Sequence, residues 1–190
     1  DADPTADLDG NGNPDDGVVD AASAGYDILW RATGVANSGP TTAEVQGANG
    51  VVDQVMVMDN SGRLVVYPLN PTNPLAVTPL ATIAPPSASG SSTRRLAPTV
   101  HEGLAFVADT NANGNGRVWV ADLVQLTRVE SPNRSWSIEG ASRLPEPSFS
   151  PTVAYIPILD NSGGVDRVLY VPTKMVSNER RPCGVTSIWF

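Results

Sequence analysis

Several residue types are scarce in this 190-residue chain, which has one cysteine, one histidine and only 12 basic residues. The single cysteine, Cys183, cannot form a disulfide within the chain, and one histidine is too few for a zinc site of clustered Cys and His. No apolar run approaches the roughly 20 residues of a membrane-spanning helix. Binding to nucleic acid or to an anionic membrane needs clustered Lys and Arg, which the scattered arginines do not supply. Neither is therefore expected as a partner.

Positive charge is missing from the first thirty residues. They contain eight Asp and no Lys or Arg, so the whole formal charge of −8 arises there. Residues 31–190 are balanced, with 12 acidic and 12 basic side chains. The sequence shows neither a start methionine nor a signal-peptide pattern, which predicts a mature or excised piece of a protein. The acidic segment is the place where a cation site is expected.

Helical spacing of apolar residues is also absent, because 17 Gly and 17 Pro interrupt almost every stretch of a dozen residues. Short runs rich in Val, Ile and aromatic residues dominate instead, each bounded by turn residues. These runs predict one all-β domain over residues 1–190, or a fragment of one. They are Val51–Met58, Leu64–Leu69, Leu75–Ile83, Gly103–Ala108, Arg117–Leu123, Thr152–Leu159, Val165–Val171 and Val185–Phe190.

Turn residues join these runs into pairs. Met58–Arg63 and Leu159–Gly164 each place Asp-Asn-Ser-Gly between two apolar runs, and these residues tolerate the positive φ of tight turns. Ala108–Arg117 is a longer version of the same connection. All three segments predict β-hairpins.

Two short motifs recur along the chain. Pro-Thr precedes a strand at Pro40-Thr41, Pro98-Thr99 and Pro151-Thr152, and Gly-Val-Val-Asp occurs at Gly17–Asp20 and Gly50–Asp53. Four-stranded units that recur about every 40–50 residues are typical of propeller blades. The sequence therefore predicts a β-propeller, or part of one, with about three to four four-stranded antiparallel blades. The alternative is an irregular β-sandwich in which the echoes are accidental.

The acidic segment contains a loop pattern that suits calcium. Oxygen-bearing side chains occupy positions 1, 3, 5 and 9 of the loop that begins at Asp7, and Gly stands at position 6. Calcium takes six to eight oxygen ligands, and a chain that curls around the ion needs Gly at its sharp turn. Position 12 is Val18, where an EF-hand has Glu, so Asp15, Asp16 or Asp20 would close the site. Residues 1–20 are thus predicted to be a calcium loop that leads into the first strand, and the alternative is a solvated acidic tail. The candidate ligands from this spacing are Asp7, Asp9, Asn11 and Asp15.

The remaining chemistry-bearing residues favour structural roles. The loop with Asp109, Asn111 and Asn113 imitates the calcium spacing but has a single carboxylate, so a plain hairpin is favoured over a second metal site. His101 is expected in a turn before a strand, and most of the four Trp are expected in sheet cores. No constellation of a nucleophile and a base stands out, which predicts that the protein is not an enzyme.

Residues 15–31, which run through Gly-Val-Val-Asp to Leu-Trp-Arg, resemble the blade motif of type IV pilus tip adhesins of the PilY type. Asp53–Tyr67 and Gly116–Leu123 resemble weaker copies, and Arg167–Lys174 with Val185–Phe190 resembles the closing strands of that family. The chain departs from the family where Val-Pro-Thr replaces Gly-Thr-Gly. The resemblance implies an extracellular, calcium-dependent propeller that acts in adhesion and in the control of pilus retraction. It implies as calcium ligands Asp7, Asp9, Asn11, Asn13 and Asp15.

Two classes of function are consistent with these patterns. The first is an extracellular, calcium-binding, non-catalytic propeller in type IV pilus adhesion, assembly or retraction control, or a generic structural component of a cell surface or filament. The second is a propeller-based enzyme, such as a quinoprotein-like dehydrogenase or a hydrolase. The chain has neither the length nor the basic residues that a quinone pocket needs, which favours the first class.

The expected partner is another polypeptide that completes or contacts the propeller, such as a pilin or filament subunit. The terminal strands would be unpaired edges unless they close on each other or on such a partner. Loops on a rigid scaffold are where binding concentrates, and the long connections are Asn70–Ser92, Glu130–Pro147 and Lys174–Pro182. Trp and Arg are favoured at the centres of interfaces, so the expected anchors are Arg134, Trp136, Arg180 and Arg181.

Overall fold

The computed structural model describes eight stretches and three isolated residues of the chain: residues 30, 32, 34, 36–47, 50–73, 76–87, 96–113, 116–129, 150–157, 165–172 and 185–189. In this part of the chain all regular elements are β-strands, which confirms the predicted all-β class. The strands form three antiparallel sheets. No helix in these residues is long and apolar enough to cross a membrane.

The first sheet is a meander of four strands in sequence order, β1 (Thr41–Gly47), β2 (Gly50–Met58), β3 (Leu64–Pro68) and β4 (Ala81–Ile83). The hairpin from β1 to β2 closes on the pair Gly47 and Gly50, and Gly50 has a φ of 113° that side-chain-bearing residues rarely adopt. The predicted hairpin at Met58–Arg63 is confirmed, because Met58 pairs with Leu64 across it.

The second sheet repeats this order with β5 (Thr99–His101), β6 (Leu104–Thr110), β7 (Gly116–Asp122) and β8 (Thr127–Arg128). His101 was expected in a turn, and this was wrong: it ends β5 and pairs with Leu104. The turn itself is Glu102-Gly103, whose φ values of 47° and 75° are both positive. Two positive φ angles are the signature of the tight hairpin turn whose twist matches that of the strands.

The third sheet contains β9 (Thr152–Pro157), β10 (Val165–Pro172) and β11 (Val185–Trp189), in the order β11-β10-β9. Its described part thus has three strands where four were predicted. In each of the three sheets the first strand begins at the Thr of a Pro-Thr pair, as the repeat predicted. The Leu75–Ile83 run is shorter than predicted, because among its described residues only Ala81–Ile83 pair with β3.

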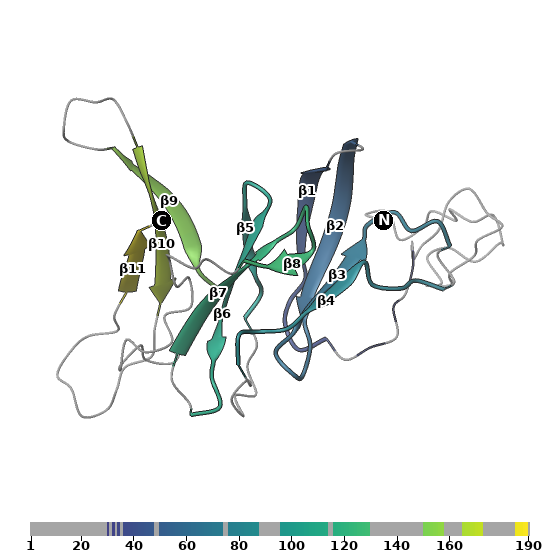
Figure 1. Ribbon diagram of the computed structural model, residues 1–190, viewed down its shortest axis with the longest axis horizontal. Helices are drawn as coiled ribbons and strands as arrows, with labels where there is room; N and C mark the ends of the chain where they lie inside the picture. The colour runs from purple at the N-terminus through teal and green to yellow at the C-terminus, as the bar shows by residue number, and fades with distance from the viewer. Residues whose placement is uncertain are drawn as a thin grey trace, which may run out of the picture.

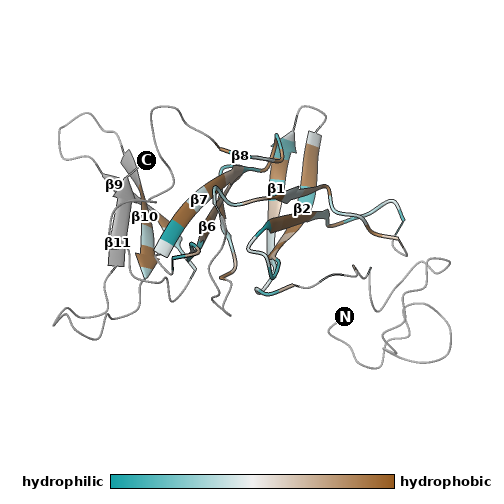
Figure 2. Cartoon of the chain, turned by 60° about the horizontal axis from the view of Figure 1, so that its bottom comes forward, coloured by the Kyte–Doolittle hydropathy of each residue, from teal (hydrophilic) through white to brown (hydrophobic). Residues whose placement is uncertain are grey.

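The middle sheet is covered on both faces (Figure 1). Along β6, Ala105 and Val107 pack on the first sheet, whereas Phe106 and Ala108 pack on the third. Side chains alternate between the two faces of a strand, so one strand can serve two interfaces. Figure 2 shows the result as hydrophobic colour along most of β6 and β7. Trp119 of β7 is 1% exposed and lies in the core, as predicted.

Two apolar clusters therefore hold the sheets together, one at each interface. The first joins Met56, Met58, Leu64 and Val66 of the first sheet to side chains of the middle sheet that include Trp119. The second joins the opposite face of the middle sheet to Leu169, Val171 and Val153 of the third. Sheets that follow one another in the sequence thus pack in the same order in space (Figure 1).

Candidate functional site

Most of the predicted site residues lie outside the part of the chain that the structure describes. This holds for the predicted calcium ligands Asp7, Asp9, Asn11, Asn13 and Asp15, and for the predicted anchors Arg134, Trp136, Arg180 and Arg181. They remain predictions. Within the described residues, no group of three or more His, Cys, Asp or Glu side chains is arranged to hold a metal ion.

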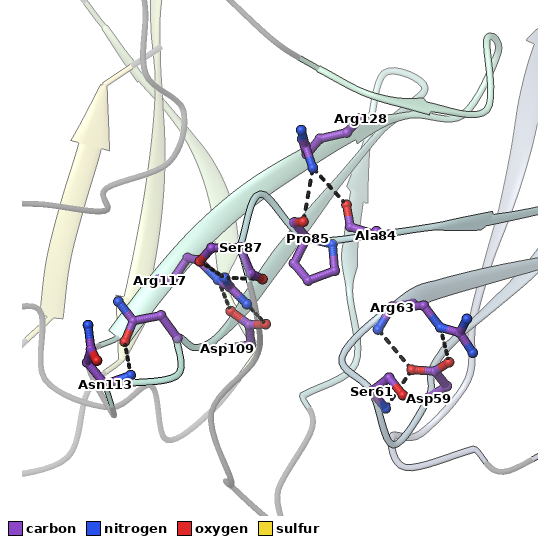
Figure 3. A network of polar contacts seen from close by, with 11 residues as sticks. Asp59, Ser61, Arg63, Ala84, Pro85, Ser87, Asp109, Asn113, Arg117 and Arg128 are labelled. Carbon is purple, nitrogen blue, oxygen red and sulfur yellow. Dashed lines mark hydrogen bonds and ion pairs between the residues drawn. The ribbon is translucent and has the colours of Figure 1, made fainter.

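The hairpin between β6 and β7 contains a buried ion pair. Arg117 Nε donates to Asp109 Oδ1, and Arg117 Nη2 donates to Asp109 Oδ2, both at 2.6 Å (Figure 3). The side chains are 0% and 1% exposed. A two-pronged arginine–carboxylate contact fixes both groups in one geometry. Thr110 pairs with Gly116 across this loop, so the hairpin favoured from its sequence is present, and both carboxylate oxygens of Asp109 face Arg117.

The same arginine also binds the connection between the first and second sheets. Arg117 Nη1 donates to the carbonyl and to the hydroxyl of Ser87, each at 3.0 Å. Arg128 of β8 donates through Nη1 to the carbonyls of Ala84 and Pro85, at 3.2 and 2.9 Å (Figure 3). The segment Ala84–Ser87 belongs to the long connection that was predicted to bind a partner. Two arginines of the middle sheet hold it, so this part of the connection has a structural role.

A second Asp–Arg pair lies in the equivalent hairpin of the first sheet. Asp59 Oδ1 accepts the backbone N–H groups of Ser61 and Arg63, and Arg63 Nε donates to Asp59 Oδ2 at 2.6 Å. An Asp side chain that accepts N–H groups just ahead of it stabilises a tight turn. Gly62, with a φ of 73°, completes this turn. The sequence carried a usable signal for both pairs, since each hairpin has an Asp near the end of its second strand and an Arg near the start of its third.

A groove of about 350 Å³ lies on the face of the first sheet that points away from the middle sheet. Its floor is formed by alternating residues of β2 and β3, and its wall by Trp30 and the small residues that follow it. The Trp30 and Tyr67 rings lie 5.7 Å apart, and Trp30 Nε1 donates to the carbonyl of Leu69 at 2.7 Å. Asp59 and Arg63 supply polar groups to the lining. The floor residues are Val55, Val57, Val65 and Tyr67.

The Pro-Thr motifs form the polar contact between successive sheets. Thr41 Oγ1 donates to the carbonyl of Pro98 at 2.8 Å. Thr99 Oγ1 donates in turn to the carbonyl of Pro151. Each Thr thus binds the Pro of the next Pro-Thr pair, and we name this interaction the Pro–Thr contact. The sequence revealed the repeat but not its role, because a hydrogen bond between units is invisible in a one-dimensional pattern.

Comparison with protein-family models, with curated proteins and with solved structures finds no match for this chain.

Proposed function

We propose that this chain is a non-catalytic, calcium-binding β-propeller module, or part of one, that acts at the cell surface in type IV pilus adhesion, assembly or retraction control. The observation that supports it most is the middle sheet, whose two faces are both buried against the sheets next to it in sequence. Repeated units that each need a neighbour to bury their faces are typical of propellers and other repeat scaffolds. Such scaffolds present loops to a partner.

The ionic groups at the described hairpins support a structural scaffold over an enzyme. Asp109 and Arg117 neutralise each other in the core, and Asp59 is occupied by its own turn and by Arg63. A general acid or base has to exchange a proton with a substrate within hydrogen-bond reach. These carboxylates instead face protein donors, and their role is to hold the strands.

The calcium part of the proposal rests on the spacing of the acidic loop and is tested by thermal unfolding of the whole chain. With a dissociation constant of roughly 10⁻⁴–10⁻³ M, as in extracellular modules, millimolar calcium should stabilise the fold by about 1 kcal/mol. Asp9→Ala should abolish this gain. Asp3→Ala removes the same charge from the same acidic segment but outside the ligand set, and it should leave the gain intact. An equal melting temperature in calcium and in chelator refutes the site.

The adhesion part is tested by binding of the purified chain to isolated type IV pili in calcium and in chelator. We expect binding that is weaker in chelator and that falls at least tenfold with Trp136→Ala and with Arg180→Ala, since interface anchors of these types often contribute more than 1 kcal/mol. Val124→Ala, at a side chain 48% exposed in the turn after β7, is the control and should bind as the parent does. A folded chain that binds no pili in either condition contradicts the pilus role.

A further inference from the structure

The groove of the first sheet has an aromatic wall that is held in place. Trp30 Nε1 donates to the carbonyl of Leu69, which fixes the indole ring beside the ring of Tyr67. The two ring centres lie 5.7 Å apart, and the rings are tilted by 38°. Both side chains line the groove together with Pro79 and the valines of its floor. The groove therefore presents an ordered, largely apolar surface.

The polar groups of the groove are arranged to donate hydrogen bonds to an occupant. Arg63 uses Nε for Asp59, and its Nη1 and Nη2 groups form no hydrogen bond with the residues that the structure describes (Figure 3). The Tyr67 hydroxyl has no hydrogen-bond partner among these residues either. The Asp59 carboxylate, by contrast, already accepts from Ser61 and Arg63. The groove thus suits an occupant that has carbonyl acceptors and few N–H donors.

The charges of the groove favour a neutral occupant. Asp59 Oδ2 lies 2.6 Å from Arg63 Nε, and both side chains line the groove. An anion bound to Arg63 would meet the negative charge of Asp59 as well, and like charges repel. A peptide carbonyl accepts a hydrogen bond without bringing a charge.

The chain itself contains an example of this kind of recognition. Arg128 Nη1 donates to the carbonyls of Ala84 and Pro85. Arg117 Nη1 donates to the carbonyl and the hydroxyl of Ser87. The segment between these contacts reads Ala-Pro-Pro-Ser. Two arginines of the middle sheet thus hold a Pro-Pro segment through its carbonyls (Figure 3).

Arg63 stands at the position of the first sheet that is equivalent to Arg117 of the middle sheet. Each arginine binds the Asp of its own hairpin at 2.6 Å. In each hairpin the Asp follows, and the Arg precedes, one cross-strand pair: Met58 with Leu64 in the first sheet and Ala108 with Val118 in the middle sheet. The guanidinium that binds a peptide segment in the middle sheet therefore borders the groove in the first sheet.

We propose that this groove binds an extended, proline-rich segment of another polypeptide. Its proline rings pack on Trp30 and Tyr67, and its backbone carbonyls accept from Arg63. Proline has no backbone N–H, so such a segment brings carbonyls without donors that need partners. It also adopts the polyproline II conformation before it binds, which lowers the entropy lost on binding. Grooves lined by aromatic side chains bind such segments in several domain families.

The test is binding of a fluorescent peptide to the whole chain, measured by fluorescence anisotropy. The probe is an eight-residue peptide of two Ala-Pro-Pro-Ser repeats, and we expect saturable binding with a dissociation constant below about 1 mM. A matched peptide with Ala in place of every Pro keeps the carbonyls but loses the rings and the ordered backbone. It should bind at least about tenfold more weakly. A peptide with Glu in place of every Pro tests an anionic occupant and should also bind more weakly than the proline peptide.

Three variants place the peptide in the groove. Arg63→Ala retains the backbone hydrogen bonds of its turn to Asp59, so it should fold, and it should weaken binding about fivefold through loss of a hydrogen bond. Tyr67→Phe keeps the ring, loses the hydroxyl and should weaken binding by a similar factor. Trp30→Ala should weaken it about tenfold, since Trp is a frequent interface anchor. Val124→Ala, at an exposed side chain outside the groove lining, is the control and should bind as the parent does.

A folded chain that does not bind the proline peptide at about 1 mM overturns the proposal. Equal binding of the alanine peptide, or tighter binding of the glutamate peptide, overturns it as well. Binding that all three groove variants leave unchanged shows that the peptide binds elsewhere, for example in place of Ala84–Ser87, and this too overturns the proposal. The probe is a peptide and the site contains none of the predicted pilus anchors, so these outcomes are independent of pilus binding.

Discussion

The hairpins of the first and middle sheets place the same Asp–Arg pair at the same point of the fold, but at different depths. In the first sheet, the Arg63 side chain is 50% exposed and that of Asp59 is 13% exposed. In the middle sheet, Arg117 and Asp109 are 0% and 1% exposed. The nitrogen–oxygen distance of 2.6 Å is the same in both pairs.

The difference in depth follows from the position of each sheet in the series. The middle sheet has a neighbour on both faces, and its arginine reaches across to Ser87 in the connection that leaves β4. The first sheet has the middle sheet on one face and the groove on the other. Ion pairs of equal geometry contribute differently to stability according to the solvent around them, since water and salt screen buried pairs much less than exposed ones. The same Asp–Arg pair thus stabilises a partly exposed turn in the first sheet and forms part of the buried core in the middle sheet.

Arg117→Ala is expected to have the largest effect on stability. It leaves the Asp109 carboxylate buried without its cation, and breaking a buried pair in this way costs about 3–5 kcal/mol. Equilibrium unfolding in urea, followed by far-ultraviolet circular dichroism, measures this loss. A cost below about 1 kcal/mol would mean that water reaches Asp109.

A paired replacement sharpens this test. When both charged groups are replaced by apolar residues of similar volume, the desolvation cost of the ions disappears together with their attraction. The double variant Asp109→Leu with Arg117→Met should therefore recover most of the stability that Arg117→Ala loses. The hydrogen bonds to Ser87 are absent from both variants. The difference in their unfolding free energies therefore measures the cost of burying the Asp109 carboxylate without its cation. A double variant as unstable as Arg117→Ala would instead assign the loss to Ser87.

Asp59→Ala is expected to have an intermediate effect, of roughly 1–3 kcal/mol, because it removes the acceptor for two backbone N–H groups and for Arg63. Asp59→Asn retains a side-chain oxygen for the turn and loses only the charge, so it should recover most of this loss. The measurement is again the free energy of unfolding. Equal losses in both variants would show that the charge, and not the turn, stabilises this hairpin.

The strand positions could be predicted from the sequence because β-branched runs end sharply at turn residues, as at Met58–Arg63. The shortest strands could not: β5 and β8 contain three and two residues, and such segments become strands only when β6 and β7 are beside them. This is why His101 was placed in a turn. The two-sided burial of β6 did have a signal, since Leu104–Ala108 is a continuous apolar run and not an alternating one.

The contacts of the candidate site could likewise be predicted only in part. The Asp-Arg spacing around both hairpins and the Pro-Thr repeat were visible in the sequence, yet their partners were not. Ser87 lies 30 residues from Arg117, and Pro98 lies 57 residues from Thr41. Contacts at such separation depend on how the sheets pack, which the pattern of a single strand does not specify. The candidate calcium ligands in Asp7–Asp15 lie close together in the sequence, so a calcium site could be predicted there. That site remains a prediction.

Arg63→Ala should have the smallest effect, and salt should distinguish it from Arg117→Ala. An exposed ion pair contributes roughly 0.2–1 kcal/mol, because water screens the charges and the long side chain loses freedom when it is held. The turn keeps its two backbone hydrogen bonds to Asp59 in this variant, so little else is lost. The difference in unfolding free energy between Arg63→Ala and the parent should shrink further in 1 M NaCl, where the screening length falls to about 3 Å. The loss for Arg117→Ala should stay nearly constant, because its partner is shielded from ions. If both losses fall equally with salt, then the two pairs are equally open to solvent and the contrast between the sheets is wrong.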